Sequence, residues 1–309
     1  MSSPSHEFAY IDWLRQQTPA ESRVILGPGD DCAIVRGTGT SPLLITTDML
    51  LEGSCFLLEE AGPRRVGRKA MSVNLSDIAA MAGIPLYAVV SVGLPRQGGR
   101  ELAEELYRGL REVADHFQVS IVGGDTNSWT GGLVISVTLF GQATERGAVP
   151  RSGAKPGDWI LVTGPLGGSI LGKHLDFTPR VREARELHQF CDLHAMIDIS
   201  DGLSQDLHHL CEESHCGAIL HAEAIPISQA AHEQANQDGK RPLEHALSDG
   251  EDFELLFTVS PEDGSRLLRD QPVSGIQLVK IGEMTSSSFE IEENGINRKL
   301  EPKGYEHEI

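Results

Sequence analysis

Five short segments of the chain each place an aspartate among small residues. They are Gly29-Asp30-Asp31, Thr46-Thr47-Asp48, Asn74-Leu75-Ser76-Asp77, Gly123-Gly124-Asp125-Thr126 and Asp198-Ile199-Ser200-Asp201-Gly202. Several directly follow an apolar, strand-like run, and carboxylates at strand ends beside glycines can converge on one cleft. So many carboxylates repel one another unless cations lie between them. Oxygen ligands of this kind suit Mg²⁺, which is usually shared with substrate phosphates, so the pattern predicts phosphate chemistry with several metal ions.

Each segment taken alone has a simpler interpretation, because aspartate is common in turns and at helix N-termini. Asp77 is the exception. It lies in a largely apolar stretch, residues 67–81, that reads as a buried helix, and Asn74 lies three positions earlier on the same helix face. A carboxylate buried there is costly without a cation or hydrogen-bond donors. Together the five segments favour a metal site.

The elements that must position these residues follow from hydrophobic periodicity. Helices are expected at 6–17, 64–82, 100–117 and 202–213, and strands at 32–35, 43–48, 86–94, 119–123, 133–141, 159–163, 218–221, 252–260 and 276–283. Strands and helices mixed in this order indicate an α/β or α+β layer fold. The stretch at 146–158 is rich in Gly, Pro and charge, which predicts a domain boundary there. We therefore expect one domain over 1–145 and a second over 146–309, ending in a polar surface tail from 286.

The composition excludes several classes of protein. The formal net charge of −19 disfavours nucleic acid or an anionic membrane as a partner. No apolar run is long enough to span a membrane, and the first residues lack the basic start and apolar core of a secretory signal. Five cysteines without a Cys-x-x-Cys pair favour a reduced, cytoplasmic protein.

Two other motifs offer competing sites. The segment Gly167-Gly168-Ser169-Ile170-Leu171-Gly172-Lys173-His174 approaches a phosphate-binding P-loop, but His174 stands where that motif needs Ser or Thr for Mg²⁺. A glycine turn between strand and helix is the simpler interpretation. His208, Cys211 and His215 are zinc-ligand types on one helix without the usual spacing, and they more simply flank its apolar face.

Taken together, the motifs resemble thiamine-monophosphate kinases, members of the superfamily of aminoimidazole ribonucleotide synthetase and selenophosphate synthetase. The resemblance runs from about residue 27 to 258. Besides the five aspartate segments, it is carried by Lys69-Ala70, Arg151-Ser152-Gly153-Ala154-Lys155-Pro156-Gly157-Asp158 and Gly250-Glu251-Asp252-Phe253-Glu254-Leu255. The last two motifs point to the kinase branch of the superfamily.

The resemblance implies an α+β fold of two domains. The N-terminal domain would form a dimeric β-barrel flanked by helices, and a C-terminal α/β domain would complete the active site. It also implies direct transfer of a phosphoryl group from ATP to thiamine monophosphate, with several Mg²⁺ ions as cofactors and a homodimer as the assembly. Phosphoryl transfer by positioning and charge neutralisation, with no covalent nucleophile, agrees with the clustered aspartates.

Residue roles carried over from the family fall into three groups. The implied Mg²⁺ ligands are Asp31, Thr46, Thr47, Asp48, Asp77, Asp125, Asp198 and Asp201, with Asp30 adjoining them. The implied nucleotide contacts are Gly124, Asp125, Arg151, Ser200 and Tyr107. The implied substrate-side positions are Cys55, Glu251 and Pro302.

Two of the substrate-side positions depart from the family pattern. Cys55 stands where the family has a substrate-holding His, and Pro302 stands where it has an aromatic residue. Both departures concern the acceptor and leave the nucleotide side intact. Two alternatives therefore stay open: an ATP-dependent enzyme of the superfamily with another acceptor, and a nucleotide-binding protein without turnover.

Overall fold

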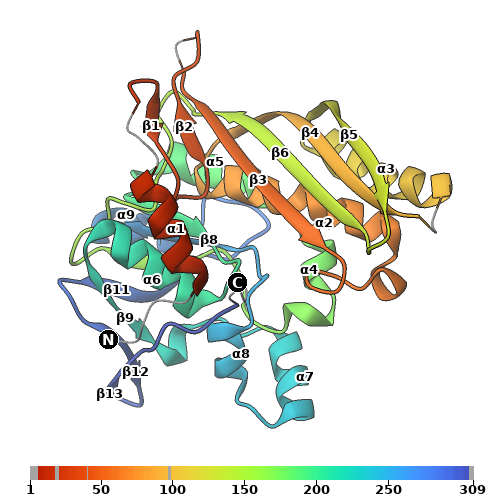
Figure 1. The fold of residues 1–309 in the computed structure, drawn as a ribbon. Helices are drawn as coiled ribbons and strands as arrows, with labels where there is room; N and C mark the ends of the chain where they lie inside the picture. Colours follow the sequence, from red (N-terminus) through yellow and green to blue (C-terminus); the bar gives the residue numbers. More distant parts are fainter. Residues whose placement is uncertain (1–5, 18–20, 40, 97–98, 306–309) are drawn as a thin grey trace.

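The computed structural model describes residues 6–17, 21–39, 41–96 and 99–305. Two mixed β-sheets and the helices around them make up the molecule, with the N-terminal sheet at the top of Figure 1 and the C-terminal sheet below it. The expected α+β class is correct. No helix among these residues is long and apolar enough to cross a membrane.

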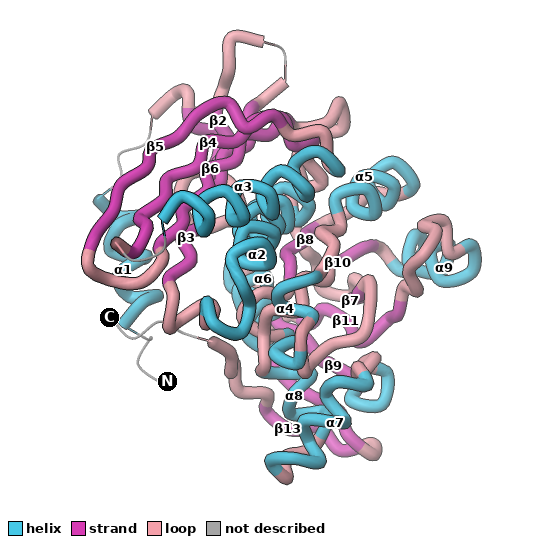
Figure 2. The backbone as a smooth tube through the Cα atoms, turned by 90° about the vertical axis from the view of Figure 1, so that its right-hand side faces the viewer, coloured by secondary structure: helices cyan, strands magenta, loops and turns pink. Residues whose placement is uncertain are grey.

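The N-terminal sheet has the strand order β1-β2-β3-β6-β4-β5. Its strands are β1 (Val24–Leu26), β2 (Ala33–Val35), β3 (Leu43–Leu51), β4 (Ile84–Pro95), β5 (Ser120–Trp129) and β6 (Val134–Gln142). Only β4 and β5 pair in parallel. Helices α2 (Leu58–Ala80) and α3 (Gly99–His116) pack on one face of this sheet, as Figure 2 shows.

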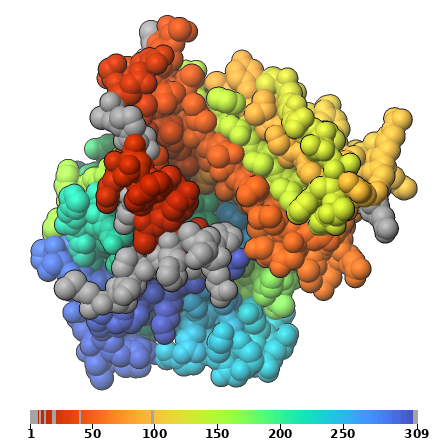
Figure 3. All heavy atoms as spheres, viewed as in Figure 1, coloured from red at the N-terminus to blue at the C-terminus, as the bar shows by residue number. Residues whose placement is uncertain are grey.

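The expectation of a β-barrel in this domain is wrong. Closure requires the first and last strands to pair. Within the described parts of the chain β1 pairs only with β2 and β5 only with β4, so the sheet is open at both edges. The short β1 and the two helices on one face produce a covered layer instead of a cylinder. The outer face, orange to yellow-green in Figure 3, is covered by no other element in that view.

The C-terminal sheet has the strand order β13-β12-β9-β11-β7-β10-β8. Its strands are β7 (Trp159–Val162), β8 (Ala195–Asp198), β9 (Gly217–His221), β10 (Leu255–Val259), β11 (Val279–Thr285), β12 (Phe289–Glu293) and β13 (Ile296–Lys299). The expectation of a polar surface tail from residue 286 is therefore wrong in part, because β12 and β13 belong to this sheet. The apolar residues Phe289 and Ile291 alternate with acidic ones, so β12 pairs in parallel with β9 and buries Ile291.

The other helices surround this second sheet. They are α1 (His6–Gln17), α4 (Lys173–Asp176), α5 (Val181–Phe190), α6 (Leu203–Ser214), α7 (Gln229–Asp238), α8 (Pro242–Ser248) and α9 (Pro261–Asp270), with 3₁₀ turns at Ser169–Leu171 and Ala222–Ala224. The long helix α2 is bent at Gly62, where φ is 71°, just before Pro63. Beyond the bend it contacts β3 and β6 on one side and α4, α5 and β8 on the other. This one helix therefore carries side chains to both halves of the molecule.

Candidate active site

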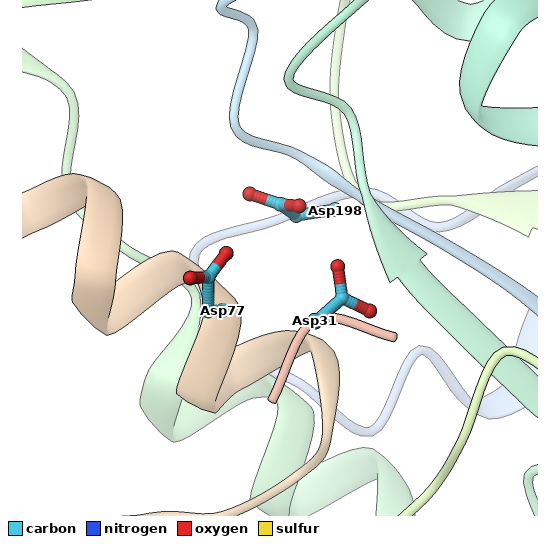
Figure 4. Close-up of side chains that lie close together, drawn as sticks. All are labelled: Asp31, Asp77 and Asp198. Carbon is cyan, nitrogen blue, oxygen red and sulfur yellow. The ribbon is translucent and has the colours of Figure 1, made fainter. Parts of the chain in front are cut away.

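Three aspartates from three separate elements meet where the two sheets face each other. Asp31 lies in the turn before β2, Asp77 near the end of α2, and Asp198 at the end of β8. One carboxylate oxygen from each lies within 4.8 Å of the other two, and the side chains point toward one another in Figure 4. Among the described residues this is the one group of three carboxylate, imidazole or thiolate ligands at such distances. His208, Cys211 and His215 belong to no such group among the described residues.

Neighbouring polar groups hold the aspartates in place. Thr46 Oγ1 on β3 donates a hydrogen bond to Asp77, and Ser76 Oγ on α2 donates one to Asp198. The Asp48 backbone N–H donates to Asn74 Oδ1 at 3.2 Å. These contacts follow from the two-residue period of a strand. Thr46 and Asp48 are two positions apart, so both side chains lie on the face of β3 that packs on α2. Asn74 and Asp77 share a face of α2, as predicted, and this face packs on β3.

The cluster has too much negative charge for its own groups to neutralise. Burial, together with the charge of Asp31, raises the pKa of Asp198 to about 8 and that of Asp48 to about 6. Burial and the neighbouring carboxylates Asp48, Asp198 and Asp31 raise the pKa of Asp77 well above its ordinary value. Asp48 Oδ2 is buried and has no hydrogen-bond partner among the described residues. The site holds carboxylates that an additional cation would stabilise.

Arg151 supplies part of the missing positive charge. Its guanidinium donates to both oxygens of Asp31, at 2.7 and 3.2 Å, and its backbone N–H donates to Asp30 Oδ2 at 3.0 Å. Burial by itself would lower the pKa of Arg151, but the charge and hydrogen bonds of Asp31 outweigh it and raise that pKa. This single guanidinium bonds Asp31 and only partly counteracts the raised pKa of Asp198, so it does not offset the charge of the whole cluster.

The donor set matches a hard divalent cation. All the available ligand atoms are oxygens, and at least one of them has no partner among the described residues. Burial and the repulsion between carboxylates raise the pKa of Asp77, and a bound dication offsets both effects. The chemistry of these groups therefore fits Mg²⁺ better than zinc or copper, which prefer nitrogen or sulfur ligands.

Three other predicted residues, Thr47, Ser200 and Asp201, are near members of this cluster in the sequence. Thr47 follows Thr46 on the strand, so its side chain lies on the outer face, where Oγ1 donates to the Val137 carbonyl. Ser200 and Asp201 form the turn after β8, where the Ser200 carbonyl accepts from the Glu251 N–H at 2.7 Å. The roles predicted for Thr47, Ser200 and Asp201 stay predictions.

A second group of predicted residues lies elsewhere on the same chain. Tyr107, Gly124 and Asp125 all line one cavity of about 500 Å³ between α3 and strands β4 and β5. The pairing register runs from Asp48 on β3 through Val137 and Val90 to Gly124, three strand spacings or roughly 14 Å away. Within one chain the Asp125 segment is therefore separate from the aspartate cluster.

The substrate-side positions lie on the other side of the cluster. The Cys55 carbonyl and the Glu251 carboxylate both accept hydrogen bonds from Lys69 of α2. Ser54 Oγ lies 3.1 Å from Tyr305 Oη, which brings the segment after β3 to the C-terminal segment that carries Pro302. Segments 54–55, 250–251 and 302–305 thus gather beside Lys69, at the middle of α2.

The glycine loop at 167–174 does not bind phosphate in the manner of a P-loop. The Gly167 N–H donates to Asp252 Oδ2 and the Gly168 N–H to Asp249 Oδ2, and Lys173 Nζ, which a P-loop would direct at the phosphates, donates to Glu254 Oε1 at 2.8 Å. His174 is buried, with Nδ1 2.9 Å from the Ser169 carbonyl. The simpler interpretation, a structural turn, is correct.

Several residues of this region were missed from the sequence. Ser76 orients Asp198, and Asp206 accepts hydrogen bonds from the Asp201 and Gly202 N–H groups and so shapes the turn after β8. Lys69 is fully buried. The weak signal for Lys69 was that it begins the apolar stretch of α2, where a buried charge requires a partner. The other two depend on contacts between distant segments.

We expect the metal-free protein to lose stability as the pH rises. In the folded state Asp48 and Asp198 have pKa values of about 6 and 8, so they keep protons that the unfolded chain releases near pH 4. The folded state binds more protons over this window, so the free energy of unfolding falls between about pH 4 and pH 8. Thermal unfolding in EDTA should give a lower Tm at pH 8 than at pH 5.5.

Mg²⁺ should raise that Tm, and the increase should be larger at pH 8, where the ligands are ionised. A Tm in EDTA that rises from pH 5.5 to pH 8, or an increase with Mg²⁺ that is larger at pH 5.5, would contradict this interpretation of the cluster.

Comparisons with known proteins agree over nearly the whole chain. Residues 29–143 match the family model described as AIR synthase related protein, N-terminal domain, and residues 155–292 match the corresponding C-terminal domain. A thiamine-monophosphate kinase of Rhodopirellula baltica is 43% identical over 285 residues, 90% of this chain and 89% of that protein. The kinase of Escherichia coli is 34% identical, covering 96% of this chain and 95% of its own. The solved structure "AaThiL complexed with AMPPCP and TMP" superposes with a TM-score of 0.83 at 32% identity, covering 97% of this chain and 96% of that one.

Proposed function

The chain belongs to the thiamine-monophosphate kinase family of AIR synthase-related proteins, and from that membership we propose how its residues carry out the reaction. It is an enzyme that transfers the γ-phosphoryl group of ATP to thiamine monophosphate, giving thiamine diphosphate and ADP. An oxygen of the acceptor phosphate forms a bond to the γ-phosphorus while the bond to the ADP oxygen breaks. The observation that carries the assignment is the convergence of Asp31, Asp77 and Asp198 in a chain with this family membership.

The metal ions are part of the proposal. Asp31, Asp48, Asp77 and Asp198, supported by Thr46, would hold more than one Mg²⁺, with Thr47, Asp125 and Asp201 as further predicted ligands. Bound Mg²⁺ would neutralise phosphate charge and hold the nucleotide and acceptor phosphates together. Arg151 lies beside this site, so it would compensate phosphate charge once Asp31 binds a metal. Gly124, Ser200 and Tyr107 are the other proposed nucleotide contacts.

We further propose that the working protein is a homodimer. Strand β5 is an unpaired edge, and Val122 and Trp129 on it are 61% and 47% exposed. An edge strand with large exposed apolar side chains is usually covered by a partner. In the dimer that we propose, the segment with Tyr107, Gly124 and Asp125 from one copy completes the site at the aspartate cluster of the other, from which it is separated within one chain. The domain boundary near 145 and a cytoplasmic location remain proposals.

The acceptor is tested by measuring ADP release with Mg²⁺-ATP and a panel of monophosphates that includes thiamine monophosphate. Thiamine monophosphate should give by far the largest kcat/KM. Turnover with another monophosphate and none with thiamine monophosphate would replace the acceptor. ATP binding without turnover on any member of the panel would favour the non-catalytic alternative.

The two departures from the family pattern predict weak acceptor binding. If Cys55 and Pro302 replace a hydrogen-bonding and a stacking side chain, each loss is worth on the order of 1 kcal/mol. Restoring both with Cys55→His and Pro302→Trp should lower KM for thiamine monophosphate by roughly ten- to a hundredfold if the two contacts add, while KM for ATP stays nearly unchanged. Steady-state kinetics of the double variant measures this effect. Equal changes in both KM values would place these residues outside the acceptor site.

A further inference from the structure

Lys69 is the largest fully buried side chain among the described residues, and it carries a charge. It lies on α2 at the same face as Val73 and Ser76, since positions i, i+4 and i+7 share a helix face. That face is turned toward the C-terminal half, where Ser76 donates to Asp198. Burying an ammonium group is costly unless hydrogen-bond acceptors surround it. The acceptors around Lys69 therefore indicate the role of this charge.

The two partners of Lys69 come from segments far apart in the sequence. Nζ donates to the Cys55 carbonyl at 2.9 Å and to Glu251 Oε1 at 2.5 Å. The first contact uses the backbone of residue 55, so it is independent of the side chain there. Lys69 thereby joins the segment after β3 to the segment before β10, and these are two of the three segments that carry the substrate-side positions.

Glu251 is held in an unusual conformation beside the aspartate cluster. Its φ is +52°, in the left-handed region that a residue with a Cβ seldom adopts, and its N–H donates to the Ser200 carbonyl at 2.7 Å. Such strain persists only where surrounding contacts hold it, and it clusters at ligand-binding sites. Oε1 is taken by Lys69, whereas Oε2 has no hydrogen bond within the described chain, and the side chain is 34% exposed.

The distance between the Lys69–Glu251 ion pair and the aspartate cluster suits the ring end of thiamine monophosphate. Lys69 precedes Asp77 by eight residues, or about 12 Å along the helix axis. The acceptor site that we infer requires a molecule whose phosphate lies at the aspartates to extend its rings in this direction, toward segments 54–55, 250–251 and 302–305. Thiamine carries a cationic thiazolium ring and an amino-bearing pyrimidine ring, and both are attracted to a carboxylate rather than to an ammonium group.

We propose that Lys69 is a positioning residue for the acceptor: it fixes the strained Glu251 so that Oε2 faces the cationic or amino-bearing end of thiamine monophosphate. This proposal rests on the proposed function and adds a residue that sets acceptor affinity. Lys69 itself touches no reacting atom. Its loss should therefore weaken acceptor binding and leave the phosphoryl-transfer machinery in place.

The test compares Lys69→Met with a matched change on the same helix, Arg65→Met. Arg65 lies one turn earlier and also pairs with the C-terminal half, through Asp176, but on the exposed surface. In Lys69→Met, KM for thiamine monophosphate should rise by about ten- to a hundredfold, because a hydrogen-bonded charge is lost, while KM for ATP changes less than about threefold. Arg65→Met should resemble the wild type in both constants.

A second variant covers the case in which Lys69→Met fails to fold. Glu251→Gln keeps the shape of a partly exposed side chain and should raise the acceptor KM by a similar factor. The double variant should be no worse than either single one, because both changes remove the same contact. Calorimetric binding of thiamine monophosphate to the protein with Mg²⁺ and AMPPCP gives a measure besides turnover, and its Kd should follow KM.

The outcomes separate this inference from the function itself. Wild-type turnover of thiamine monophosphate together with an unchanged acceptor KM in Lys69→Met and Glu251→Gln overturns the inference and leaves the function standing. Equal rises in both KM values, or the same effect in Arg65→Met, reveal a purely structural ion pair. A wild-type protein that binds ATP but neither binds nor phosphorylates thiamine monophosphate overturns both.

Discussion

Replacing Asp198 or Asp48 by asparagine should lower kcat by roughly a thousandfold or more, while the protein remains folded. Each change removes a charge from the site proposed to hold Mg²⁺, and electrostatic stabilisation in such sites is worth several kcal/mol. The folded protein should tolerate the change, because burial and repulsion already raise the pKa of both carboxyls. The metal-free variants should have a Tm equal to or above that of the wild type, with a smaller increase on adding Mg²⁺.

Asp158→Asn is the matched control. Asp158 is also buried and belongs to the same half as Asp198, but it bonds His194 and the Lys155 N–H away from the cluster. This variant should lose stability and keep kcat within about twofold, since it weakens the buried hydrogen bonds of residue 158 without touching the site. Full activity in both Asp198→Asn and Asp48→Asn would remove the cluster from the mechanism.

Mixing two inactive variants should restore activity if two chains share each site. Asp198→Asn and Asp125→Asn should each be inactive as pure proteins. In a heterodimer of the two, one site combines both mutated residues and the other site is intact. Random pairing on coexpression makes about half of the dimers heterodimers, so about a quarter of all sites, and of wild-type activity, should be recovered. The prediction follows from the separation, within one chain, between the Asp125 strand and the aspartate cluster.

The control for this mixing experiment is a pair of variants within one cluster. Coexpressed Asp198→Asn and Asp48→Asn should stay inactive, because every site in the heterodimer then has one damaged cluster. If Asp198→Asn with Asp125→Asn also gives no recovery although the heterodimer forms, the two residues act in separate sites or Asp125 acts within its own chain.

The sequence predicted those parts of the site that depend on local pattern. The convergence of Asp31, Asp77 and Asp198 follows from acids at the ends of apolar runs and from a buried helix that carries two polar residues. Strand alternation is also local, and it separates Thr47 from Thr46 and Asp48. The parts that could not be predicted depend on pairing between distant segments. They include the order of the strands, the open sheet in place of a barrel, and the contact of Lys69 with Glu251.

The same distinction explains the two competing motifs. The glycine loop resembles a P-loop by spacing, and only the tertiary contact with Glu254 shows that Lys173 is already paired. His208, Cys211 and His215 share a helix, yet no zinc-type cluster includes them among the described residues. Short spacing patterns identify which residues are candidates, whereas contacts between distant segments determine which of them meet.

The most direct test of direct phosphoryl transfer follows the label of γ-³²P-ATP in a reaction with Mg²⁺ and thiamine monophosphate. The account predicts that the label appears in the terminal phosphate of thiamine diphosphate, with one thiamine diphosphate formed for each ADP and no labelled orthophosphate beyond the blank without enzyme. Label released as orthophosphate while ADP accumulates, or ADP formation without thiamine diphosphate, would contradict it.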